Sequence, residues 1–212
     1  MIGTSVFAEE KLTIEKQLVG IVGAISGTVK TETRELKAGD KIYLNETIVA
    51  GAGSGTQILL LDQSTFTIGE DSEVVMDTFI YDPKTNDGKI VASVKQGSLK
   101  VISGLISQKD PDALTVTVPE GTLGSRGTEF QTIVSKGKTD TLLIGPGKNN
   151  TLGMRPGAVL ASNKFGKTLL DNPYSVTSMS KGKAPDRARK ACLLYTSPSP
   201  RDRTRSRMPS SA

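Results

Sequence analysis

The side chains that enzymes use most for acid–base and nucleophilic chemistry are nearly absent from this sequence of 212 residues. There is no histidine, which removes the commonest general base and the commonest metal ligand. The single cysteine, Cys192, can form neither an internal disulfide nor a cysteine-type metal site. Neighbouring carboxylates such as Glu70 and Asp71 act as acid and base only in a cleft, and here they lie on a turn-like segment. We therefore predict a protein that is not an enzyme and that uses no metal and no cofactor.

Three glycine-containing segments resemble ligand-binding loops only in part. A phosphate loop leads into a helix, whereas Gly51–Gly55 leads into a strand-like run. The segment Gly145–Lys148 lacks the glycine spacing of such a loop, and Asn149 follows its lysine. Asp82–Gly88 has Lys84 where a calcium loop needs an oxygen ligand. We expect a turn, a loop and a hairpin turn at these three places.

The net charge of +5 is concentrated near the C-terminus. Residues 192–212 hold four arginines and one aspartate, which accounts for +3 and leaves +2 for the rest. Because no basic stripe with interleaved aromatic residues occurs elsewhere, we do not expect a nucleic acid partner. No apolar run approaches the roughly 20 residues that cross a bilayer, so we expect no transmembrane segment in this chain.

The two ends of the chain differ in composition from its middle. Val6 and Ala8 are small residues spaced as a signal peptidase requires, although no charged region or full apolar core precedes them. We interpret residues 1–18 as the remnant of a signal peptide plus a linker, which predicts a periplasmic or secreted protein. Residues 192–212 read CLLYTSPSPRDRTRSRMPSSA and resemble translated sequencing-adapter and primer sequence more than an ordinary Ser/Pro/Arg tail. We expect this tail to be non-native, so that both natural termini are unknown.

The middle of the chain alternates between short β-type runs and turn residues, at a spacing of roughly 8–12 residues. The runs are Gly20–Ile25, Thr28–Thr33, Thr47–Ala50, Thr56–Leu61, Thr65–Ile68, Glu73–Tyr81, Lys89–Lys95 and Ser98–Ser103. Helical signal is limited to short stretches such as Gly104–Asp112. We predict an all-β fold, an antiparallel β-sandwich or β-roll of many short strands with little helix.

The same pattern predicts how the chain is divided. Residues 19–134 form one β domain, and residues 135–174 extend it with further short apolar runs. Residues 175–191 are polar and basic, which predicts a linker.

The segment Gly121–Phe130 (GTLGSRGTEF) stands out from the rest. Its three glycines permit a positive φ or a close approach of two backbones. Arg126, placed between small residues, either pins a carboxylate or carbonyl across a sheet edge or contacts a partner, and the first alternative is favoured. Phe130 begins a strand that alternates apolar and polar residues.

Several motifs occur in a fixed order and together resemble a FecR domain, the sensing domain of iron-dicitrate regulators. They are Leu36–Asp40 (LKAGD), Asn45–Ile48 (NETI) running on to Gly51, Asp62–Ile68 (DQSTFTI) with Ser72, Glu73–Pro83 (EVVMDTFIYDP), Gly97, Pro119 and Gly124–Phe130. The resemblance covers roughly Val19–Val134. Eight motif residues are candidates for a structural or partner-contacting role: Gly39, Asp40, Gly97, Gly124, Arg126, Gly127, Thr128 and Phe130.

In the regulators of this family, the domain lies in the periplasm behind a membrane helix and a cytoplasmic anti-sigma segment. This sequence instead resembles the stand-alone, exported type, so the anti-sigma activity is not carried over and a link to iron is implied by the family name alone. We expect a protein-binding or sensory module of unknown oligomeric state, whose exposed sheet edges accept a strand from a partner. The alternative is a structural component of the cell envelope, or a fragment of a longer surface protein.

Overall fold

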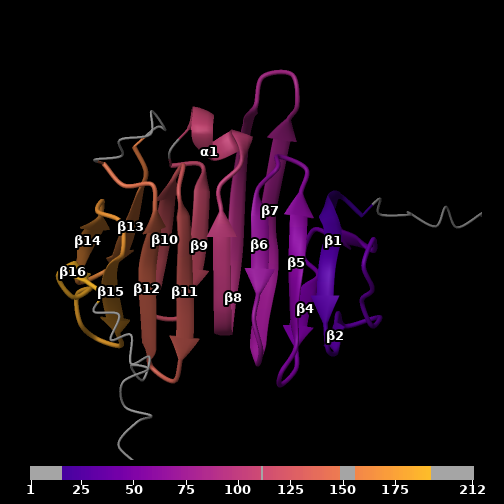
Figure 1. The fold of residues 1–212 in the computed structure, drawn as a ribbon, viewed down its shortest axis with the longest axis horizontal. Coiled ribbons are helices and arrows are strands. Elements are labelled where there is room, and N and C mark those ends of the chain that lie inside the picture. The colour runs from indigo at the N-terminus through magenta and orange to yellow at the C-terminus, as the bar shows by residue number, and fades with distance from the viewer. Residues whose placement is uncertain (1–15, 111, 149–155, 192–212) are drawn as a thin grey trace, which may run out of the picture.

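The computed structural model describes residues 16–110, 112–148 and 156–191, and most of these residues lie in strands (Figure 1). Residues 1–15 of the signal-peptide remnant and linker expected at 1–18 lie outside the described residues, and so does the adapter-like tail with Cys192. The helix α1 (Leu105–Lys109) is the single helix of the described part. It is too short to cross a bilayer, so the described residues contain no helix that could span a membrane.

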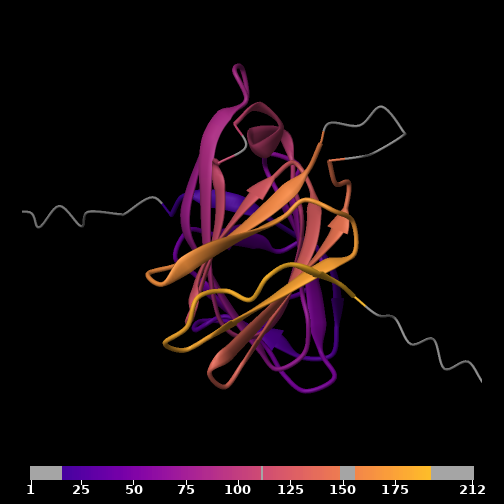
Figure 2. The ribbon, with the colours of Figure 1, turned by 90° about the vertical axis from the view of Figure 1, so that its left-hand side faces the viewer.

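Two layers of strands make up the molecule (Figure 2). In spatial order, sheet A consists of β3 (Lys41–Tyr43), β1 (Leu18–Ser26), β5 (Gly55–Leu60), β6 (Thr65–Ile68), the second part of β8 (Asp87–Ile102), β11 (Glu129–Ser135), β12 (Lys138–Gly145), β15 (Ser175–Ser180) and β16 (Arg189–Lys190). Sheet B consists of β2 (Val29–Lys30), β4 (Thr47–Ala50), β7 (Ser72–Asp82), the first part of β8, β9 (Leu114–Val118), β10 (Gly121–Arg126), β13 (Ala158–Asn163) and β14 (Gly166–Leu170). Neighbouring strands are antiparallel except β8 and β9, which are parallel. The predicted all-β sandwich or roll is confirmed.

The long strand β8 joins the two sheets because it bends at Gly97. Its first part pairs with β7 as far as Gln96, and its second part pairs with β6 and β11 from Gly97 onward. Gly97 has φ +86°, a backbone conformation that glycine adopts without a steric penalty. The sequence predicted two strands here, Lys89–Lys95 and Ser98–Ser103. The structure has one continuous strand that changes sheet.

The core lies between the sheets and follows from the alternation of side chains along each strand. In β6, for example, Phe66 and Ile68 point inward and are buried, whereas Thr65 and Thr67 are partly exposed. The three largest buried side chains are Phe66, Phe79 and Phe130, and all three belong to strands of this interior. Burial of Phe130 therefore gives this motif residue a packing role.

The segment 175–191 is not the linker that its polarity predicted. It forms β15, which pairs with β12 from Lys138 to Leu143, and β16. The inward side chains of β15 include Ser175 and Thr177, whose hydroxyls donate to the backbone oxygens of Asn172 and Asp186. A hydroxyl that is hydrogen-bonded can be buried at little cost, so this polar strand packs as an apolar one would.

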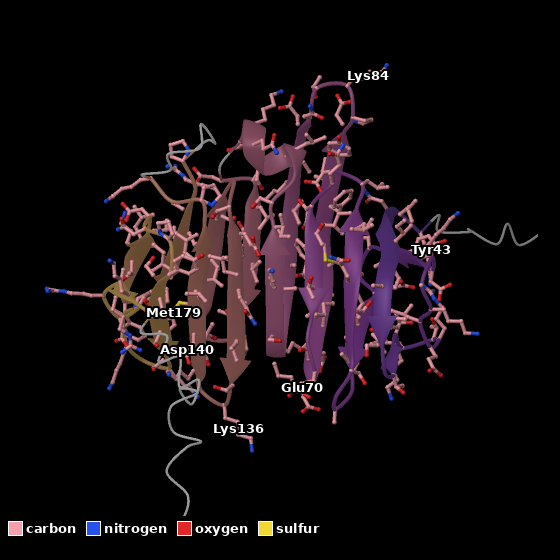
Figure 3. The ribbon with its side chains drawn as sticks, in the orientation of Figure 1. Tyr43, Glu70, Lys84, Lys136, Asp140 and Met179 are labelled. Carbon is pink, nitrogen blue, oxygen red and sulfur yellow. The ribbon has the colours of Figure 1, made fainter. Side chains whose placement is uncertain are left out.

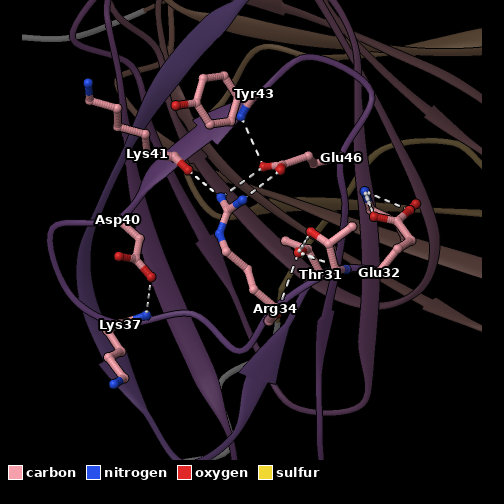
Figure 4. Close-up of polar contacts among 10 residues, drawn as sticks. Thr31, Glu32, Arg34, Lys37, Asp40, Lys41, Tyr43 and Glu46 are labelled. Atoms are coloured by element: carbon pink, nitrogen blue, oxygen red, sulfur yellow. Dashed lines mark hydrogen bonds and ion pairs between the residues drawn. The ribbon is translucent and has the colours of Figure 1, made fainter. Parts of the chain in front are cut away.

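Side chains cap the edge of the sandwich that is formed by β3 and the loop before it (Figure 4). The Arg34 guanidinium binds both carboxylate oxygens of Glu46, at 2.9 and 3.2 Å, and donates to the Lys41 carbonyl at 2.5 Å. Glu46 also accepts the Tyr43 amide hydrogen at 3.1 Å. Because these contacts occupy backbone groups of β3, an incoming strand cannot use them. This end of the sandwich therefore does not offer the open edge that we expected.

Candidate partner-binding surface

Two of the sequence motifs meet on the loop that precedes α1. The Ser64 hydroxyl donates to the buried Asp62 carboxylate at 2.8 Å and accepts the Gly104 amide hydrogen at 2.8 Å. From the other side, the Ser103 hydroxyl donates to the Thr128 carbonyl at 2.8 Å and accepts the Thr128 amide hydrogen at 3.2 Å. Thr128 and the DQS motif thus act together as a buried polar clamp that holds this loop in place.

Other candidate residues also have structural roles. Gly39 and Asp40 form a turn in which Asp40 accepts the Lys37 amide hydrogen at 2.8 Å. The same turn continues the edge of β1, because Gly39 N donates to Val22 O and Val22 N donates to Asp40 O. Gly127 has φ +51° in the short turn between β10 and β11. Gly39 and Gly127 thus serve the backbone conformation, and Asp40 stabilises its own turn.

Gly124 and Arg126 differ from the other candidates because both lie on the outer face of sheet B. The Arg126 guanidinium is exposed and lies 3.5 Å from the Asp112 carboxylate. Asp112 lies in the loop before β9, and exposed pairs of this kind contribute little to stability. Arg126 is therefore available to a partner as well.

A shallow groove, here called the Gly124 groove, lies over this face and has a volume of about 310 Å³. Gly124 forms its floor, since a Cβ at this position would have no heavy atom within 4 Å. The backbone partners of Gly124 on either side are Leu160 in β13 and Thr115 in β9. Leu160 and Leu169 leave apolar surface exposed along one wall. The groove thus combines an apolar wall with one ion pair at its end.

A second hollow, here called the Phe165 cleft, adjoins this groove and has a volume of about 680 Å³. The two share Thr122 and Ser162, whose hydroxyl oxygens lie 3.0 Å apart. Three turns form the cleft: the one between β9 and β10, the one between β13 and β14, and the one after β15. Phe165, half exposed, supplies its aromatic surface.

Asn163 fixes two walls of the Phe165 cleft relative to each other. Its side-chain oxygen accepts the Phe165 amide hydrogen at 2.9 Å, and its side-chain nitrogen donates to the Lys183 carbonyl at 2.8 Å. At the base of the cleft, a Cβ on Gly121 would overlap the Ser162 carbonyl, so β10 and β13 approach closely here. The cleft is therefore a built feature of the fold.

Sequence reasoning did not single out Lys164, Phe165 or Lys181, because three turns far apart in the sequence bring them together. A signal was present in the charge distribution. Residues 157–191 hold seven Lys or Arg and two Asp, a net charge of +5. Residues 1–156 hold 16 Lys or Arg and 19 Asp or Glu, a net charge of −3. The net charge of +2 calculated for residues 1–191 as a whole concealed this separation into a negative and a positive part.

The shift in pKa that bears most directly on this end of the molecule is that of Asp140 in β12. Burial opposes the charged form, but the hydrogen bonds from Ser178 and Lys138, and the charges of Lys138 and Arg189, outweigh it and lower the pKa of this carboxyl. In the described residues, no group of three or more metal-ligating side chains is close enough to hold a metal ion.

Comparisons with known proteins find a family model that matches part of this chain. Residues 46–144 match the family model described as FecR protein. This match confirms, over that range, the resemblance to a FecR domain that the sequence shows. The matched range begins after Gly39 and Asp40 and includes the other six candidate residues. No curated protein sequence matches the chain.

Two crystal structures with a similar fold belong to a protein of Parabacteroides distasonis that is described as a candidate anti-sigma factor. They have TM-scores of 0.50 and 0.49, and both are 9% identical in sequence to this chain. Each match covers 68% of this chain and 59% of the other. At this identity the likeness shows the fold alone. The chain spans well under two thirds of the length of that protein.

Proposed function

We propose that this chain is a non-catalytic sensory module of envelope signalling, exported to the periplasm or secreted, and that it works by binding a protein partner. The observation that carries the proposal is the FecR domain at residues 46–144, together with a groove on sheet B next to two of its motif residues. The description of the solved neighbour as a candidate anti-sigma factor agrees with a signalling role. We do not extend anti-sigma activity or iron binding to this chain.

The contact surface in this proposal is the Gly124 groove. Most of the motif residues hold the fold together. The exposed surfaces of Gly124 and Arg126 are not needed for that, so they are free to contact a partner. Exposed apolar side chains beside a charged rim are typical of surfaces that bind proteins. Leu160 and Leu169 supply the apolar part, and Arg126 with Asp112 supplies the rim.

A pair of matched variants tests this proposal. Leu169 in β14 and Ile133 in β11 are each 49% exposed, on opposite sheets. Leu169→Glu places a charge in the proposed interface, and Ile133→Glu makes the same chemical change elsewhere. Wild-type protein and both variants are immobilised and exposed to an envelope extract of the source bacterium at moderate salt. Bound proteins are then quantified by mass spectrometry.

We expect a specific protein that binds the wild type and Ile133→Glu equally but binds Leu169→Glu at least about tenfold less, because an unpaired charge would be desolvated. Circular dichroism spectra of the variants serve as the folding control. Equal recovery of the bound protein by both variants would refute the Gly124 groove as the contact surface. Recovery of no specific protein at all would refute protein binding and favour the alternative of a structural envelope component.

A further inference from the structure

We infer that the Phe165 cleft binds an acidic, extended peptide segment of the partner, with the carboxylates of that segment held by lysines and an apolar residue against Phe165. This inference rests on the proposed function, since it supplies the chemistry of the partner. It starts from the charge around the cleft. Lys164 and Lys181 line it, and Lys167 lies opposite Ser162, which also lines it.

These three lysines have no carboxylate partner among the described residues. Elsewhere in that part of the chain, ion pairs are common, such as Lys95 with Glu73 and Lys100 with Glu129. The ammonium groups at the cleft therefore present positive charge to solvent without an ion-pair partner of their own. The Lys164 nitrogen lies 5.0 Å from the centre of the Phe165 ring, so one turn offers both a cation and an aromatic face.

One carboxylate, that of Glu120, also lines the cleft. It accepts a hydrogen bond from the buried hydroxyl of Thr139, which keeps it at the wall. Its negative charge partly offsets the lysines and should weaken the binding of an acidic ligand. Neutralising Glu120 should therefore strengthen binding. Damage to the fold could not produce that gain.

The shape of the surface favours an extended chain. The cleft continues into the Gly124 groove through Thr122 and Ser162, so the hollow follows the direction of β10 and β13. The six residues of β10 span roughly 20 Å, the length of about six extended residues of a ligand. A peptide held in the cleft by its carboxylates and by its apolar residue on Phe165 can thus continue along the groove past Leu160 and Leu169.

The test uses fluorescence anisotropy with the full 212-residue chain and a labelled nonapeptide rich in Asp and Glu with one central Leu. A peptide with Asn and Gln in place of the acids is the ligand control. A sulfated hexasaccharide of equal charge is the competitor. The cleft variants are Lys164→Gln with Lys181→Gln, Phe165→Ala, and Glu120→Gln. The matched control is Lys84→Gln with Lys89→Gln on the β7–β8 hairpin. Lys84 lies at the opposite end of the sandwich from Lys136 (Figure 3), whose neighbour Gly137 accepts the amide hydrogen of the cleft residue Lys181.

We expect the cleft double variant to bind the acidic peptide about tenfold more weakly, since each exposed ion pair contributes roughly a threefold to fivefold change. Phe165→Ala should weaken binding by about tenfold. Glu120→Gln should strengthen it by about threefold. The Lys84/Lys89 double variant should stay within about twofold, because salt screens charges beyond about 10 Å.

Equal affinity of the cleft double variant and the Lys84/Lys89 control would overturn the inference, and so would weaker binding by Glu120→Gln. Displacement of the peptide by the hexasaccharide at equal concentration would show a general polyanion site and would equally overturn it. The proposed function is judged separately. If Leu169→Glu loses a natural partner that the cleft variants retain, the sensory module stands and the acidic-peptide site fails.

Discussion

A series of three glycine-to-alanine substitutions tests the account of how β8 joins the two sheets. At Gly97, alanine would need a positive φ of +86°, and its Cβ would overlap Oγ and Cα of Ser72 and lie 2.6 Å from Ser72 Cβ. At Gly137, alanine would need a φ of +72° but would meet no heavy atom within 4 Å. At Gly124, neither obstacle exists. The series therefore separates backbone strain from steric overlap.

The magnitudes follow from these geometries. A left-handed conformation costs a non-glycine residue about 1 kcal/mol, which is the expected loss of stability for Gly137→Ala. Gly97→Ala adds overpacking of about 2 kcal/mol, for a total of about 3 kcal/mol. Rotation of the Ser72 side chain cannot relieve the overlap, because Ser72 Cα is backbone. Gly124→Ala should lie within about 0.5 kcal/mol of the wild type.

Urea unfolding measured by far-UV circular dichroism is the suitable assay, since the chain has no tryptophan. If the same variants are unfolded by heat instead, a loss of about 3 kcal/mol corresponds, for a domain of this size, to a fall in Tm of roughly 6–12 °C. The three variants should keep the same m-value, so that the midpoints report stability. If Gly97→Ala is no less stable than Gly137→Ala, the bend at Gly97 is not tightly packed against Ser72 and the reasoning is wrong.

Three further substitutions test two other parts of the structure. Arg34→Ala should lower the free energy of unfolding in urea by about 2 kcal/mol, because the Glu46 side chain is 8% exposed and would lose its counter-ion. The control, Lys95→Ala, breaks an exposed ion pair and should lower it by at most about 0.5 kcal/mol. Equal losses of stability would contradict the capping role of Arg34. Asp140→Asn should be less stable than the wild type at pH 7. Because the folded-state pKa of Asp140 is lowered, its carboxylate stabilises the fold above the unfolded pKa of about 3.9, and this contribution is lost as the pH falls through the folded pKa. The difference between Asp140→Asn and wild type should thus shrink below about pH 4, and a difference that stays constant from pH 7 to pH 3 would show that the charge is not its cause.

The sequence predicted strands best where apolar and polar residues alternate. Thr47–Ala50 and Thr65–Ile68 were predicted with the bounds that β4 and β6 have, because one face of each is buried. It failed at Ser175–Ser180, where inward serine and threonine side chains are satisfied by local backbone oxygens. Hydropathy cannot distinguish such a strand from a linker, since it counts the serine and threonine side chains as polar whether or not their hydroxyls are hydrogen-bonded.

The candidate site, too, could be predicted from the sequence only in part. The glycine pattern identified Gly124 and Arg126 because their types were unusual for their setting. It also identified Thr128 and Gly127, whose roles are structural, since a motif does not reveal on which face of a strand a residue lies. The Phe165 cleft depends on three turns that meet only in the fold. The one feature of the cleft that can be seen in the sequence is the excess of positive charge in residues 157–191.

How a partner can be recognised depends on which backbone groups the fold leaves open. The outermost strands β2, β3 and β16 have two or three residues each, and Arg34 covers part of β3. Beside β14, the Thr168 hydroxyl donates to the Pro185 carbonyl, and Gly166 packs closely on Ala184. Short, covered edges discourage the addition of a strand. A partner that docks on the face of sheet B must instead engage side chains, and side-chain contacts, unlike a shared backbone ladder, distinguish one partner sequence from another.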